Sequence, residues 1–155
     1  MRSGRRLAID VGKVRIGVAA SDFHSILASG LETVPRGENL ETSLKRIVEL
    51  VNEVEPIEIY VGLPVSMAGN HSVSTEDAID FARQLASLVS PEVRFIDERM
   101  TTLTAANALK MSGRDSKSGR QIIDQIAATV ILEQAMEQEK STGKQPGKAM
   151  GEING

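Results

Sequence analysis

The sequence contains no cysteine and no tryptophan, and only one tyrosine and three phenylalanines occur among its 155 residues. The absence of cysteine excludes disulfide bonds, thiolate metal sites and cysteine nucleophiles. No stretch approaches the run of roughly 18 apolar residues that a transmembrane helix needs, and the basic start "MRSGRRLAID" lacks the apolar segment of a signal peptide. We therefore expect a cytoplasmic protein that does not contact a membrane.

The overall composition is typical of one globular domain. Hydrophobic residues make up 41% of the chain and charged residues 25%, which suffices for one sizeable core. The last stretch, "STGKQPGKAMGEING", offers little that could be buried. We expect a single domain over residues 1–140 and a disordered tail over residues 141–155.

The hydrophobic pattern predicts an α/β fold. Alternating apolar residues over 6–11 and 14–21 indicate a hairpin, and a third run over 26–34 extends it to an antiparallel three-strand meander. The remaining chain alternates between helical and strand patterns, with helices from residue 40 and over about 75–89, 103–111 and 119–140, and strands over 57–64 and 92–96. Strands that follow helical crossovers pair in parallel, so we expect a five-strand mixed sheet with helices on both faces.

The start of the second helix carries a recognisable capping signal. Ser74 is followed three residues later by Asp77, a spacing that resembles a capping box. We therefore expect this helix to begin at about Thr75.

Two aspartates occupy positions where a carboxylate is unfavourable. Asp10 lies inside an apolar strand pattern, where it either faces solvent or has a function. Asp124 shares its side of a helical wheel with Ala127, Ala128 and Ile131, so it points into an apolar sector. No basic residue stands at its helical-neighbour positions, and its partner should therefore come from elsewhere in the fold.

A third acidic position follows the last predicted strand, in the stretch "FIDERMTT". Strand side chains alternate, so only one of Asp97 and Glu98 can face inward on a given side. Arg99 could pair with either acid, and the charges at the end of the strand would then form only a salt bridge. Alternatively, Glu98 converges with Asp10 and Asp124, and such a cluster needs cations, for which oxygen ligands favour Mg²⁺ or Mn²⁺ over zinc.

Four motifs in order carry a resemblance to a known family: "AIDVGKVRIGVAASD", "YVGLPVSMAGN", "FIDERMTT" and "IIDQIAATVILEQAM". Together they resemble the YqgF family of Holliday-junction-resolvase-like proteins, also described as pre-16S rRNA nucleases. The resemblance covers about residues 6–136. It implies a ribonuclease-H-like fold and a divalent-metal-dependent nuclease that hydrolyses phosphodiester bonds in structured nucleic acid.

The resemblance also implies roles for particular residues. Asp10, Glu98 and Asp124 match the three acidic positions of the metal-binding catalytic set, which would hold one or two Mg²⁺ ions. Phosphate contacts that position nucleic acid without reading its sequence would come from the basic residues nearby, namely Lys13, Arg15, Arg99, Arg114, Lys117 and Arg120.

The loop after the fourth strand is expected to line the cleft. Gly62 and Gly69 would allow close backbone approach, with Pro64 between them, although a plain connecting loop is the alternative. The two histidines, His24 and His71, are interpreted as incidental loop residues, because neither adjoins a nucleophile or has ligand spacing.

Three other functions stay open at the level of sequence. A Holliday-junction resolvase is one, although the last helix has Ala127 where a fourth acidic residue occurs in resolvases of the RuvC type. A nucleic-acid-binding or transcription-associated module with little catalysis is the second, and the net charge of −3 favours it. The stretch "DVGKVRIGVA" also resembles the phosphate-binding hairpin of actin-like ATPases, but those need two such domains and this chain has room for one.

Overall fold

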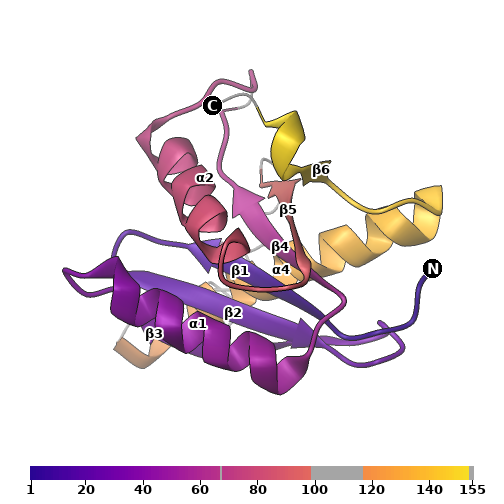
Figure 1. Ribbon diagram of the computed structural model, residues 1–155, viewed down its shortest axis with the longest axis horizontal. Helices are drawn as coiled ribbons and strands as arrows, with labels where there is room; N and C mark the ends of the chain where they lie inside the picture. Colours follow the sequence, from indigo (N-terminus) through magenta and orange to yellow (C-terminus); the bar gives the residue numbers. More distant parts are fainter. Residues whose placement is uncertain (67, 99–116, 154–155) are drawn as a thin grey trace.

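The computed structural model describes residues 1–66, 68–98 and 117–153. Its centre is a mixed six-stranded sheet in the order β3-β2-β1-β4-β5-β6 (Figure 1). No helix in these three ranges is both long and apolar enough to cross a membrane. The predicted helix over 103–111 lies outside the described residues.

The first three strands form the antiparallel meander that the sequence predicts. β1 (Arg6–Val11) pairs with β2 (Arg15–Ser21), and β2 pairs with β3 (Ala28–Pro35), with a register shift between Val18 and Ala19. β4 (Glu58–Leu63) then lies parallel to β1, and β5 (Glu92–Asp97) lies parallel to β4. The carboxyl ends of β1, β4 and β5 therefore meet at one edge of the sheet.

Helices cover both faces of the sheet, and the alternation of strand residues separates the two cores. α1 (Leu40–Val54) and α2 (Val73–Ala86) pack on the face that carries Leu7 and Ile9. α4 (Lys117–Thr142) packs on the other face, against Ala8, Tyr60 and Ile96 (Figure 1). Asp10 follows Ala8 by two residues, so it belongs to the face beneath α4.

The second helix begins earlier than its sequence signal indicates. Ser72 is the N-cap of α2 and forms a reciprocal capping box with Thr75, rather than Ser74 with Asp77. Asp77 instead accepts two hydrogen bonds from Arg36, at 2.6 and 2.7 Å. The local spacing predicted that Asp77 would cap the helix. Its carboxylate instead forms a bidentate, charge-assisted contact with Arg36, which lies outside the helix.

The prediction of a disordered tail from residue 141 is wrong for the part that follows α4. β6 (Lys148–Ala149) adds a sixth strand, antiparallel to β5, and η1 (Met150–Glu152) leads to the buried Ile153. Polar contacts hold this segment, because Arg94 donates to the carbonyls of Pro146 and Gly147. Long-range hydrogen bonds thus order a stretch that has little hydrophobic content.

Candidate active site

The site is built around Asp10 and Glu98, which share a hydrogen bond on the α4 side of the sheet. Asp10 projects from the end of β1, opposite Gly17 on β2. Glu98 directly follows β5, and its amide donates to the carbonyl of Leu63 at 3.1 Å, which extends the strand pairing by one residue. Glu98 therefore projects to the same face as Ile96, two residues earlier.

Between these two acids runs β4, and the residue on its surface there is Gly62. A Cβ atom at Gly62 would lie 2.6 Å from the Cδ of Glu98 and 2.5 Å from the Cδ1 of Ile131 on α4. Glycine thus leaves the space through which the Glu98 side chain reaches across β4. Gly62 was predicted to lie in a loop that lines the cleft. In the structure it lies within β4, under the acid pair.

The surroundings make the pair hold a proton. Burial raises the pKa of Glu98 to about 9, and the charge and hydrogen bond of Asp10 contribute to the rise. Burial also raises the pKa of Asp10, the hydrogen bond from Glu98 opposes that rise, and the charge of Asp124 adds to it. The two acids together therefore take up a proton more readily than two separate carboxyl groups in water would.

Asp124 lies beside this pair but is held by an arginine. The Nε of Arg15 on β2 donates to the Oδ2 of Asp124 at 2.7 Å. Gly17 allows this approach, because a Cβ there would collide with the backbone of α4 at Asp124. The expectation that Asp124 finds its partner elsewhere in the fold is confirmed. The partner is Arg15, which was expected from the sequence to contact phosphate.

The three acids do not form a preformed metal cluster. Over residues 1–66, 68–98 and 117–153, no group of three or more histidine, aspartate or glutamate side chains is arranged to hold an ion. The chemistry of the donors nevertheless fits a hard divalent cation, since carboxylate oxygens are the ligands that Mg²⁺ prefers in proteins. Asp10 and Glu98 supply such oxygens, and Asp124 acts electrostatically on Asp10.

The remaining predicted site residues divide into two groups. Lys13 is exposed in the β1–β2 turn, Pro64 accepts a hydrogen bond from the Thr75 hydroxyl, and Gly69 adopts φ 85° in the loop after β4. Arg99 and Arg114 lie outside the described residues, as do the side chains of Lys117 and Arg120. Their phosphate contacts stay predictions.

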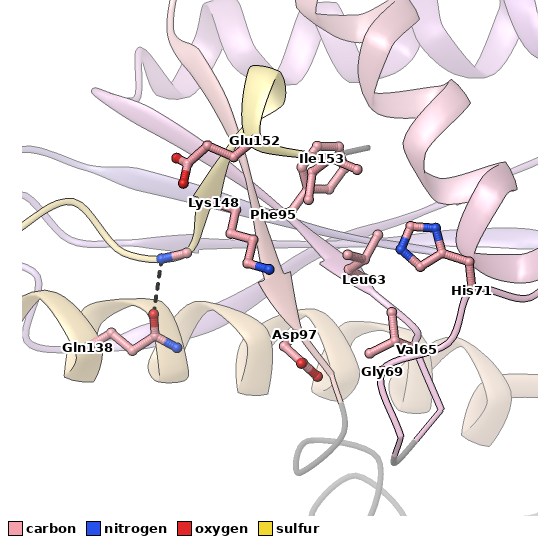
Figure 2. A pocket seen from close by; sticks show the side chains of 11 residues that line it. Leu63, Val65, Gly69, His71, Phe95, Asp97, Gln138, Lys148, Glu152 and Ile153 are labelled. Carbon is pink, nitrogen blue, oxygen red and sulfur yellow. Dashed lines mark hydrogen bonds between the residues drawn. The ribbon is translucent and has the colours of Figure 1, made fainter. Parts of the chain in front are cut away.

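A hollow of about 510 Å³ lies on the face of β5 that carries Phe95, which is opposite to the face that carries Glu98 (Figure 2). Apolar side chains of Leu63, Phe95 and Ile153 line it, and Asp97 and Lys148 project into it. Sequence reasoning missed Lys148 because it assigned that residue to a disordered tail. The position of Asp97, on the face opposite Glu98, agrees with the alternation expected from the strand.

Comparison with solved structures defines the fold class first. The chain is similar to the structure of T. thermophilus RuvC in complex with Holliday junction substrate, with a TM-score of 0.57 over 92% of this chain and 99% of that one. A second T. thermophilus RuvC structure gives a TM-score of 0.54. The sequence identities are 17% and 16%, so the likeness shows the fold alone, which is ribonuclease-H-like as the motifs implied.

Sequence comparison then gives the family. The RuvX family model, described as Holliday junction resolvase, matches residues 4–138, and the chain belongs to this family. A Streptomyces avermitilis relative named "Putative pre-16S rRNA nuclease" is 49% identical over 151 residues, which cover 97% of this chain and 96% of the relative. A Clavibacter sepedonicus relative of the same name is 46% identical, with 95% and 91% covered. The resemblance to YqgF proteins is thereby confirmed.

Proposed function

We propose that this protein is a divalent-metal-dependent nuclease that hydrolyses phosphodiester bonds at the 5′ end of pre-16S rRNA in the cytoplasm. The observation that carries the proposal is the half-buried, hydrogen-bonded pair of Asp10 and Glu98 at the carboxyl edge of the sheet. Burial raises the pKa of both acids, and strongly perturbed titratable groups that lie together are typical of functional sites.

Asp10 and Glu98 would bind the metal ion, with Asp124 as the third acidic residue. Both members of the pair must be ionised to bind it, so metal binding would release the proton that the pair takes up. A divalent ion held by these carboxylates would supply Lewis-acid chemistry, namely activation of a water and stabilisation of the leaving oxygen. Gly62 leaves the space that the Glu98 carboxyl group occupies above β4.

Arg15 has two tasks in this proposal. It holds Asp124 in the metal-free protein, and its side chain is 31% exposed, so it can also reach a phosphate. Arg15 is the first residue of β2, and Lys13 lies in the turn just before it, so two basic residues follow Asp10 closely in the chain. Arg99, Arg114, Lys117 and Arg120 are proposed to extend this phosphate contact, since such contacts position nucleic acid without reading its sequence.

Cleavage of four-way DNA junctions is the second candidate, and the family description and the fold shared with RuvC favour it. Against it, Ala127 stands on α4 where a fourth acidic residue would complete a four-carboxylate set. A module that binds nucleic acid with little catalysis is a third reading, in which the acid pair would have no chemical task.

One assay separates these functions. The purified chain is incubated with Mg²⁺ and either an RNA that carries the pre-16S 5′ end or a four-way DNA junction. We expect cleavage of the RNA by the wild type and a loss of at least about a thousandfold for Asp10→Asn. Asp80→Asn, on the exposed side of α2, is the matched control. Equal rates for wild type and Asp10→Asn would contradict the catalytic assignment, and preference for the junction would select the second candidate.

A further inference from the structure

The end of β1 that carries Asp10 extends beyond the pairing of this strand with β4. That parallel pairing ends at Ile9, opposite Val61, whereas the antiparallel pairing with β2 continues to Val11, opposite Ile16. The position of Asp10 therefore depends on the β1–β2 hairpin more than the positions of the preceding residues do. A contact that holds this hairpin in place also holds the acid.

The two strands of the hairpin approach each other closely at its tip. The amide of Gly12 donates to the carbonyl oxygen of Arg15 at 3.0 Å, and a Cβ atom at Gly12 would lie 2.5 Å from the same oxygen. Arg15 is the first residue of β2, and its side chain holds Asp124. Both strands of the hairpin therefore carry a residue that belongs to the acid site, Asp10 on β1 and Arg15 on β2.

Arg36, which directly follows β3, binds this tip at two points. Its amide donates to the carbonyl of Val14 at 2.8 Å, and its Nη1 donates to the carbonyl of Gly12 at 2.9 Å. Gly12 and Val14 are the first and the last residue of the turn between β1 and β2. One residue thus holds both ends of the turn.

The same guanidinium group connects the turn to α2. Its Nη1 and Nη2 donate to the two carboxylate oxygens of Asp77 at 2.6 and 2.7 Å, which is a bidentate contact with fixed geometry. These hydrogen bonds hold the pKa of Asp77 below its ordinary value. α2 is itself anchored in the main core by buried residues that include Ile79 and Phe81. The turn is therefore tied to a well-packed helix.

A direct contact with a substrate phosphate is the alternative role for Arg36. Its Nη1 and Nη2 already donate to Gly12 and Asp77, and the carboxylate of Asp77 neutralises its charge. The Arg36 side chain is 16% exposed, compared with 31% for Arg15. These contacts favour a role in positioning the turn.

We propose that Arg36 is a positioning residue for phosphodiester hydrolysis, which, together with Asp77, anchors the β1–β2 turn to α2 and so holds Asp10 in place. This inference rests on the proposed nuclease function. α2 covers the face that carries Ile9, whereas Asp10 lies beneath α4. The influence of Arg36 therefore passes through the backbone of the turn. Such placement matters because a misplacement of about 1 Å at a reacting group can slow a reaction roughly a hundredfold.

The metal-free protein gives the first test. In Arg36→Gln, we expect the NMR order parameters of the Gly12 and Lys13 amides to fall from about 0.85 toward 0.6, because the turn loses its anchor. Arg46→Gln is the matched control, since Arg46 on α1 makes the same kind of bidentate contact with Glu32 on β3, at 2.7 and 2.7 Å. It should leave both amides unchanged. Unchanged order parameters in Arg36→Gln would overturn the proposal.

Cleavage of the RNA with Mg²⁺ gives the second test. Arg36→Gln should lower kcat about tenfold and change KM less than about threefold, because the reacting groups are misplaced while substrate binding is kept. Arg46→Gln should keep both values, although it breaks a contact of the same kind. Equal losses of kcat in the two variants would indicate a general loss of stability and would overturn the positioning role.

Asp77→Asn separates positioning from a direct phosphate contact. If Arg36 bound the substrate, removal of its acidic partner would free the guanidinium group and lower KM. We expect instead a lower kcat, as in Arg36→Gln, and a double variant little worse than either single variant, because both residues act through one contact. A lower KM with unchanged kcat in Asp77→Asn would overturn the inference alone. If the wild type does not cleave, the proposed function fails, and the NMR measurement still decides whether Arg36 anchors the turn.

Discussion

The two ends of the sheet both bury charge, but they do so in opposite ways. At the amino end of β1 and β4, Glu139 accepts hydrogen bonds from Arg2 and Arg6 at 2.6 and 2.8 Å, and Glu58 accepts from Arg2 at 2.8 Å. At the carboxyl end, Asp10 meets another acid. In the first cluster each acid is paired with arginine, whereas in the second two acids lie together and the charge of Asp10 raises the pKa of Glu98.

The pKa values express the same difference. Burial raises the pKa of Glu139, but hydrogen bonds from Arg2 outweigh it and hold the pKa below its ordinary value. Burial raises the pKa of Glu98 as well, and there the neighbouring acid adds to the rise. Burial of a carboxylate therefore does not by itself indicate a functional site, and the identity of its partner decides.

The largest expected effect is on stability and comes from breaking the amino-end cluster. Glu139→Gln would leave Arg6, which is fully buried, without its anionic partner. Its Nε and Nη1 already have no hydrogen-bond partner within the part of the chain that the structure describes. We expect the free energy of unfolding in urea to fall by about 3–5 kcal/mol.

The control for this change is Glu137→Gln, two residues away on the exposed side of α4, which should have little effect. Because the pKa of Glu139 is lowered, its stabilising contribution is present above the ordinary glutamate pKa and is lost as the pH falls below it. A change in Glu139→Gln no larger than in Glu137→Gln would contradict the stabilising role of the pairing with arginine.

The next effect concerns the geometry of the carboxyl-end pair. Gly62→Ala places a methyl group 2.6 Å from the Glu98 carboxyl carbon, so the Glu98 side chain must shift from its present position beside Asp10. We expect kcat to fall roughly ten- to hundredfold, as for a misplacement of about 1 Å. Gly151→Ala, where a Cβ would meet nothing within 4 Å, should keep full activity. Equal kcat values in the two variants would show that the space above Gly62 is not needed.

The smallest effect is a pH dependence that distinguishes the two ends. Because the pKa of Glu98 is raised to about 9, its protonated form stabilises the metal-free protein fully below the unfolded pKa of 4.5, and this contribution is lost as the pH rises toward 9. Between pH 5 and 8 the melting temperature should fall on the order of 5 °C further than in the double variant Asp10→Asn/Glu98→Gln.

Addition of Mg²⁺ should reverse this fall in the wild type and leave the double variant unchanged, because metal replaces the proton. Parallel melting curves for the two proteins at every pH would mean that the acid pair is not coupled to a proton at all.

The parts of the fold that follow from periodicity could be predicted from the sequence. The alternation of Leu7, Ile9 and Ala8 in β1 identifies two faces, and Asp10 then falls on the face of Ala8 without further information. The anomaly of Asp124 among small apolar residues likewise indicates a partner from another element. These inferences depend only on local geometry, which the chain carries within a few residues.

The parts that could not be predicted depend on contacts between distant segments. Nothing in two residues, Lys148 and Ala149, signals a strand, because β6 exists through its pairing with β5. The interaction of Arg15 with Asp124 required knowing that Gly17 lets α4 approach β2. The place of Gly62 under Glu98 depends on the strand order, which puts β4 between β1 and β5.

The sixth strand also sets an order of events during synthesis. β6 follows α4 in the chain, so all the residues of that helix lie between β5 and β6 in the sequence. The β5–β6 pairing is therefore far less local in sequence than the pairings of the meander. β1, β4 and β5 all precede β6 in the chain. During synthesis the residues of the acid pair are therefore made before Lys148, which completes the wall of the hollow.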